Sequence, residues 1–265
     1  MGNKRKAVSK KTLILLNNQI NNILIIMSDT KINSNSLVAR WNDVCAEVVA
    51  SAIKANRDPS DVKIIAVSKT QPSSVLIEAM SSGVTVFGEN YALEAIEKYN
   101  ALSVVGLSPE WHFIGHLQSN KVKMIAPFVT MIHSVDSLKL AREISKCAIE
   151  NNRKIQILIQ VNTSGEESKS GCEPNEVRNL VEEIIKLPSI ELCGLMTIPS
   201  FTATDDELRR EFTILRQIRD ELKLIYHSIH HLSMGMSGDF PLAISEGATM
   251  IRIGTAIFGE RVYTK

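Results

Sequence analysis

The chain has 265 residues, of which 44% are hydrophobic and 22% charged, as expected for a soluble globular protein large enough for a full core. Residues 1–28 carry five basic residues and no acid, which leaves a net charge of −4 on the rest of the chain. An acidic body argues against nucleic acid as the main partner. The apolar stretch 12–27 is interrupted by five Asn and Gln residues and is too polar to cross a membrane.

The four cysteines lie far apart and form no Cys-x-x-Cys pair. This spacing is typical of free thiols in a reducing cytoplasm, and it favours neither a disulfide framework nor a zinc site. The stretch before Met27 also lacks a small-residue cleavage site for a signal peptide. We interpret residues 1–28 as an extension, either a disordered arm or a misread start with Met27 as the true first residue. Residues 29–265 are the predicted folded domain.

Hydrophobic periodicity predicts one helix over residues 37–57, followed by eight strand–helix units. The predicted strands are 62–68, 84–87, 111–114, 129–133, 155–161, 190–196, 231–234 and 250–253. The longer predicted helices are 74–82, with Ser73 or Ser74 as N-cap, and 92–99, 120–126, 137–151, 174–187 and 205–227. Neither a linker nor a repeat divides them. The pattern predicts a single-domain α/β protein, a (β/α)₈ TIM barrel with an extra N-terminal helix; a doubly wound sheet is the alternative.

In such a barrel the reactive groups follow the strands on one face. Lys69 follows the first strand, where burial would lower the pKa of its amine, and a neutral amine forms a Schiff base with an aldehyde. The alternative is a lysine that extends to water. Asn90 and His116 follow the second and third strands and are predicted to line the same pocket, although a solvated loop is equally compatible with His116.

The last two units carry glycine-containing loops at 234–238 and 252–259, the positions at which barrels often bind phosphate. Ser237 and Thr255 add hydroxyl donors to the backbone N–H groups of these loops. Arg252 stands between two isoleucines in the last strand, and a buried guanidinium needs an acceptor such as a ring nitrogen or a carboxylate. The alternative for Arg252 is a structural ion pair, for example with Glu246 or Glu260.

His112 and His116 have a spacing that would suit a metal site on a helix. On the extended chain predicted here they lie about 13 Å apart, too far to share one ion. We therefore predict no metal site.

An aldehyde-reactive lysine, a phosphate grip and an arginine at a ring nitrogen together suggest pyridoxal 5′-phosphate (PLP). The sequence resembles the pyridoxal-phosphate homeostasis proteins, single-domain relatives of the alanine racemase N-terminal barrel. The resemblance is carried, in order, by residues 66–70 (Ala-Val-Ser-Lys-Thr), 87–91 (Phe-Gly-Glu-Asn-Tyr), 111–121 (Trp-His-Phe-Ile-Gly-His-Leu-Gln-Ser-Asn-Lys), 133–136 (His-Ser-Val-Asp), 194–196 (Gly-Leu-Met), 233–237 (Ser-Met-Gly-Met-Ser) and 252–259 (Arg-Ile-Gly-Thr-Ala-Ile-Phe-Gly).

The resemblance implies a Schiff base on Lys69 and Arg252 beside the pyridine nitrogen. It implies phosphate contacts from Ser237, Gly254 and Thr255, with the backbone of Met236 nearby. The loop 163–171 also matches the family, but its role is not readable from its residues. Lys169 within it either reaches over the pocket mouth or is solvated, and we expect the solvated position.

The resemblance implies a cytoplasmic protein that holds PLP and takes part in its homeostasis, with little or no catalytic turnover. We expect it to be a monomer that exchanges PLP with free amino acids and passes it on to acceptor apoenzymes. The alternatives are a PLP-dependent amino-acid racemase or decarboxylase, and an aldolase that uses Lys69 without a cofactor. Alanine racemases draw a second catalytic group, a tyrosine, from an additional C-terminal domain that we expect this chain to lack. An arginine at the ring nitrogen would also make the ring a poorer electron sink.

Overall fold

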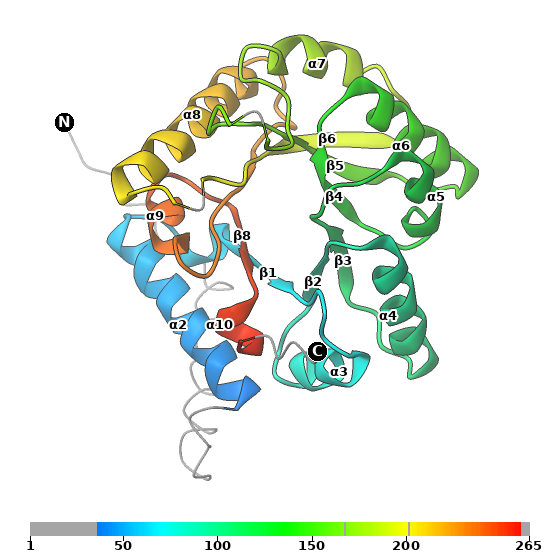
Figure 1. Cartoon of the computed structure of the whole chain (residues 1–265), viewed down its shortest axis with the longest axis vertical. Helices are drawn as coiled ribbons and strands as arrows, with labels where there is room; N and C mark the ends of the chain where they lie inside the picture. Colours follow the sequence, from blue (N-terminus) through cyan, green and yellow to red (C-terminus); the bar gives the residue numbers. More distant parts are fainter. Residues whose placement is uncertain (1–35, 167, 201, 261–265) are drawn as a thin grey trace, which may run out of the picture.

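The computed structural model describes residues 36–166, 168–200 and 202–260, so the predicted extension 1–28 lies outside the described residues. Parallel strands close into a barrel in chain order, with β1 paired to β8 (Figure 1). The strands are β1 Lys63–Val67, β2 Val86–Glu89, β3 Glu110–Phe113, β4 Met131–Val135, β5 Ile155–Gln160, β6 Ile190–Met196, β7 His231–Ser233 and β8 Met250–Ile253. The predicted TIM barrel is confirmed, and the doubly wound alternative is wrong because the sheet is closed.

Helices surround the barrel (Figure 1). They are α2 Leu37–Lys54, α3 Ser73–Ser81, α4 Ala92–Val104, α5 Val122–Ile125, α6 Leu138–Glu150, α7 Val177–Ile184, α8 Asp205–Lys223, α9 Phe240–Ser245 and α10 Thr255–Phe258, with 3₁₀ turns η1 Pro59–Asp61 and η2 Ser119–Lys121. The extra N-terminal helix, α2, packs against α9 and α10 and so lies beside the last strand–helix units.

The strands divide the apolar residues into an outer and an inner set. Outward side chains pack with the helices in the main core, whereas the inner set is small: Ile65, Val86, Met131, Leu158, Cys193, Met196 and Met250. Because side chains alternate along a strand, Arg252 points inward like Met250. Lys69 lies four residues after the inward Ile65, at the mouth of the barrel.

Several element bounds differ from the sequence prediction, among them the starts of two strands and of helix α7, which begins at Val177 instead of residue 174. β2 and β4 each begin two residues later than predicted, because their bounds follow the pairing of neighbouring strands rather than the local apolar run. His133 therefore lies within β4 instead of at its end. The predicted serine N-cap of α3 is also wrong: the extended Pro72 takes that position, and Ser73 is already helical.

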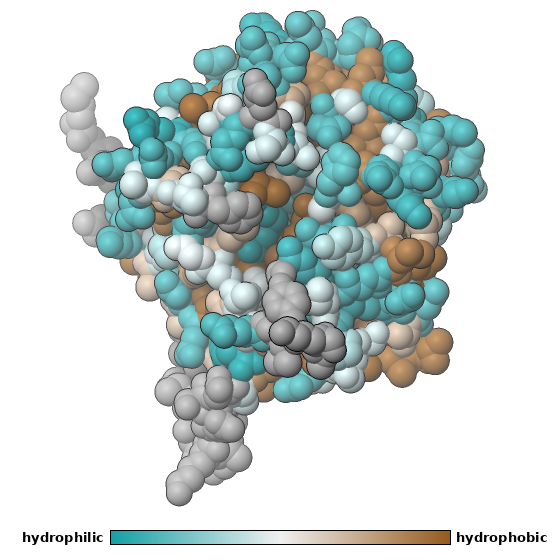
Figure 2. All heavy atoms as spheres, viewed as in Figure 1, coloured by the Kyte–Doolittle hydropathy of each residue, from teal (hydrophilic) through white to brown (hydrophobic). Residues whose placement is uncertain are grey.

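The face shown in Figure 2 is largely hydrophilic, with patches of hydrophobic residues mainly on its right side. In the part of the chain that the structure describes, no helix is long and apolar enough to span a membrane.

Candidate cofactor site

Lys69 lies in a tight turn directly after β1, and helix α4 holds both sides of this turn. On one side the Lys98 ammonium donates to the carbonyl oxygen of Ser68 at 2.6 Å. On the other side the N–H of Thr70 donates to Glu94 at 2.5 Å, and Thr70 has a left-handed φ of 67°. The position of the half-buried Lys69 is therefore set by charged residues on a neighbouring helix.

Lys98 is itself the centre of a buried charged cluster. Its ammonium pairs with Glu89 and Glu94, each at 2.7 Å, and the Ser68 hydroxyl donates to Glu89 at 2.6 Å. Burial raises the pKa of the Glu89 carboxyl, and the nearby Lys98 charge opposes that rise. This cluster was not predicted from the sequence, although a lysine on the apolar stripe of α4, between Ala95 and Leu102, was a signal for it.

Arg252 lies inside the barrel, and its hydrogen-bond acceptors among the described residues are both neutral. Its guanidinium donates to the Ser233 hydroxyl and to the Thr197 carbonyl oxygen, both at 2.8 Å. Burial lowers the pKa of Arg252 to about 10, so the group stays charged at neutral pH.

The ion-pair alternative for Arg252 is wrong. Glu246 pairs with Arg209 at 2.5 Å and with Arg216 at 3.2 Å, and Glu260 is exposed. Among the residues that the structure describes, Arg252 makes no ion pair, so this buried cation is available to face a neutral or anionic ligand group.

The loops after β7 and β8 meet at the predicted phosphate site. The backbone N–H of Ala256 donates to the Ser237 hydroxyl at 3.4 Å, which joins one loop to the start of α10. Ser237 is half-buried and Thr255 is exposed, so both hydroxyls are within reach of a ligand. The N–H of Met236 donates to Asp239 at 2.5 Å and is thus already engaged.

The pairing of β1 with β8 brings these groups to the lysine. Ile65 pairs with Arg252, and the point where a Cβ would stand on Gly254 is 3.6 Å from the Cβ of Val67. β8 and β1 lie side by side, and α10 follows β8 (Figure 1). Lys69, Arg252 and the two loops therefore share one end of the barrel.

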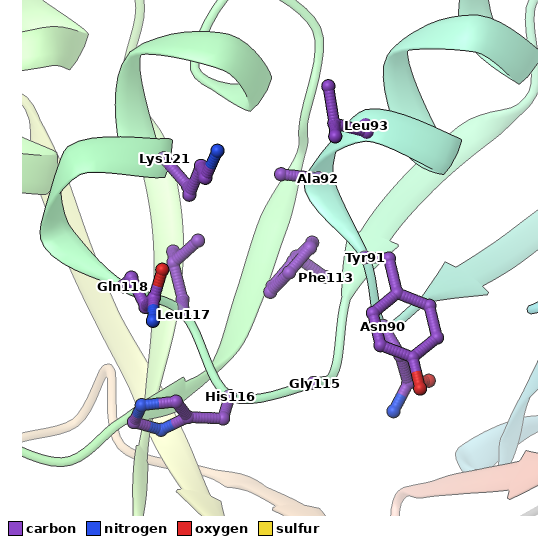
Figure 3. A pocket seen from close by; sticks show the side chains of 10 residues that line it. All are labelled: Asn90, Tyr91, Ala92, Leu93, Phe113, Gly115, His116, Leu117, Gln118 and Lys121. Carbon is purple, nitrogen blue, oxygen red and sulfur yellow. The ribbon is translucent and has the colours of Figure 1, made fainter.

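Asn90 and His116 lie on neighbouring loops at a groove of about 500 Å³. Figure 3 shows Asn90 on one side and His116 on the other. Backbone packing fixes their spacing, because a Cβ on Gly115 would come within 2.4 Å of the Asn90 carbonyl oxygen. The side chain of His116 is exposed, with its Nδ1 3.9 Å from Asp136. Neither Lys69 nor Arg252 lines this groove, and the roles of Asn90 and His116 stay predictions.

The polar groups fit an anionic aldehyde such as PLP. The site offers an amine, a guanidinium and two hydroxyls. Directly after β2, the buried Asn90 Oδ1 has no hydrogen-bond partner among the described residues. Unsatisfied buried oxygens are costly unless a ligand or water meets them. Within the described residues no group of His, Cys, Asp and Glu is arranged to hold a metal ion.

Lys169, in the loop 163–171, is not the solvated lysine that we expected. Its side chain is 15% exposed, and its ammonium pairs with Glu166 at 3.0 Å. The Asn162 amide donates to the Glu166 carbonyl oxygen at 3.1 Å, so the loop folds back on its own start.

Comparison with known proteins identifies the family. Residues 50–262 match the alanine racemase N-terminal domain. The chain is 45% identical over 225 residues to the pyridoxal phosphate homeostasis protein of Aquifex aeolicus. The matched region covers 84% of this chain and 98% of that protein. The chain belongs to the pyridoxal phosphate homeostasis protein family. The family resemblance seen in the sequence is confirmed.

Solved structures of similar chains agree with this family. PipY of Synechococcus elongatus, solved with PLP bound, is 37% identical with a TM-score of 0.71 and covers 81% of this chain and 100% of its own. A protein of unknown function from Bifidobacterium adolescentis is 35% identical with a TM-score of 0.81, covering 87% of this chain and 97% of its own.

Proposed function

We propose that this protein binds PLP and takes part in its homeostasis in the cytoplasm. Lys69 holds the cofactor as a Schiff base, and Arg252 faces the ring nitrogen. Ser237, Gly254 and Thr255 bind the phosphate, with the backbone of Met236 close by. Asn90 and His116 contact the cofactor, or the incoming amino acid, from the rim.

One observation carries this proposal: Arg252 and the turn of Lys69 come from paired strands at the end of the barrel where two hydroxyl-bearing loops converge. A phosphate, a ring nitrogen and an aldehyde would each meet a suitable partner there. The PLP bound to PipY supports the same ligand class.

The residues around the ring argue against efficient catalysis. PLP supplies an aldehyde and a ring that withdraws electrons when its nitrogen is protonated. Arg252 can only donate hydrogen bonds, and with a pKa of about 10 it remains protonated at neutral pH. A ring nitrogen facing it stays unprotonated. We therefore propose a protein that holds PLP and does not turn amino acids over; we further propose that it is a monomer and that it exchanges PLP with free amino acids and acceptor apoenzymes.

A racemase or decarboxylase is the alternative, and an isotope experiment separates it from a carrier. The PLP-loaded protein is incubated with L-alanine and other amino acids in deuterated water, and D-isomer, Cα deuterium and released CO₂ are measured. A carrier gives only traces of each. Turnover on the order of 1 per second or faster, the ordinary enzyme range, would establish an enzyme instead.

A further inference from the structure

A chain of hydrogen bonds runs inside the barrel from its amino-terminal end to Arg252. Glu110 on β3 bonds His112 Nε2 at 2.8 Å, and His112 Nδ1 bonds Nε2 of His133 on β4 at 2.8 Å. His133 Nδ1 then meets the Ser233 hydroxyl at 2.8 Å, and that hydroxyl accepts from Arg252 at 2.8 Å. Both histidines are buried, with exposures of 1% and 0%.

The donor inventory fixes every proton in this chain when both rings are neutral. The Glu110 carboxylate accepts only, so His112 carries its proton on Nε2 and its Nδ1 accepts. His133 must then also carry its proton on Nε2, and its Nδ1 accepts from Ser233. All donation therefore runs one way, from Arg252 to Glu110.

This direction matters for the buried guanidinium. Arg252 has no ion-pair partner among the described residues, and the charge of Asp239 offsets the cost of its burial only in part, so the quality of its hydrogen bonds matters. A hydroxyl that donates its own proton onward is a better acceptor, because bonds in a chain polarise one another. At the other end of the hydrogen-bond chain, the Lys63 ammonium forms an ion pair with Glu110 at 3.1 Å.

We propose that His133 and His112 are positioning residues, which orient the Ser233 hydroxyl and through it hold Arg252 against the ring nitrogen of the cofactor, with Glu110 as the last acceptor of the hydrogen-bond chain. Neither histidine needs to touch the cofactor. The inference rests on the proposed function, since it assumes that PLP places its ring nitrogen at Arg252.

The test compares PLP with an analogue in which a C–H group replaces the ring nitrogen. In the unmodified protein we expect tighter binding of PLP. His133→Leu should reduce this preference about tenfold, equivalent to 1.4 kcal/mol. In His133→Asn the amide oxygen can accept from Ser233 as Nδ1 does, so the preference should largely return. His231→Leu is the matched control. That inward histidine bonds Thr249 at 3.1 Å and takes no part in the hydrogen-bond chain.

Equal weakening of both ligands by His133→Leu would mean a merely structural role and overturn the inference. Failure of the unmodified protein to prefer PLP, or to bind it, would overturn the Arg252 placement itself. Should His133→Leu not fold, ¹⁵N NMR of the unmodified protein decides the question. Both rings are expected as Nε2–H tautomers. A proton on Nδ1 of His133 would contradict the proposed direction of the hydrogen-bond chain.

Discussion

At the scale of single residues, the proposed phosphate binding depends on two hydroxyls from different loops. Ser237→Ala combined with Thr255→Val should weaken PLP binding by a few kcal/mol, since a hydrogen bond to a charged group contributes roughly 1.5–3 kcal/mol. Titration with PLP and with pyridoxal, which has no phosphate, measures the effect. Pyridoxal should bind almost unchanged, and Ser245→Ala on α9 is the control. Equal losses for both ligands would contradict the phosphate assignment.

The candidate site residues could be predicted from the sequence by their place after the strands, whereas their contacts with neighbouring strands and helices could not. Lys69, Arg252 and the two loops follow from the barrel pattern, because the carboxyl ends of parallel strands share one face. The bond between His112 and His133 depends on the lateral register of β3 and β4, which local periodicity does not contain. The partners of Lys98 could not be predicted from the sequence either, although its position on an apolar helix stripe could.

At the scale of elements, α4 supports the turn that carries Lys69. Lys98→Met leaves two carboxylates without their cation, and breaking a buried pair in this way costs about 3–5 kcal/mol. Urea unfolding should report that loss, and PLP binding should weaken as well because the turn loosens.

Lys146→Met on α6 is the matched control for Lys98→Met. Lys146 is 65% exposed and lies 4.0 Å from Glu150, so its removal should change the free energy of unfolding by about 0–1 kcal/mol. Similar losses of unfolding free energy in the two variants would contradict a special role for Lys98.

At the scale of the whole molecule, neutral histidines inside the barrel make stability depend on pH. Burial lowers the pKa of His112, of His133 and of His231, the last to about 4. The unfolded chain therefore binds protons first as pH falls below about 6.5, and the fold loses stability from there downward.

Thermal unfolding between pH 8 and pH 4.5 tests this dependence. Tm should be nearly constant above pH 7 and fall below about 6.5. The hydrogen bond from His112 lowers the pKa of Glu110 to about 2, so the contribution of this carboxylate is lost only below about pH 4.5 and does not disturb the range. His231→Gln should flatten part of the decline, and a Tm that rises on acidification to pH 5 would refute the assignment of neutral rings.

The covalent link between Lys69 and PLP is the central claim, and borohydride reduction followed by peptide mass spectrometry tests it most directly. The PLP-loaded protein should carry one reduced pyridoxal-phosphate group, on the peptide that contains Lys69. Lys69→Ala should lose this adduct but keep some affinity for PLP, because the phosphate contacts lie on other loops. A reducible adduct that persists in Lys69→Ala, or that maps to another lysine in the unmodified protein, would contradict the account.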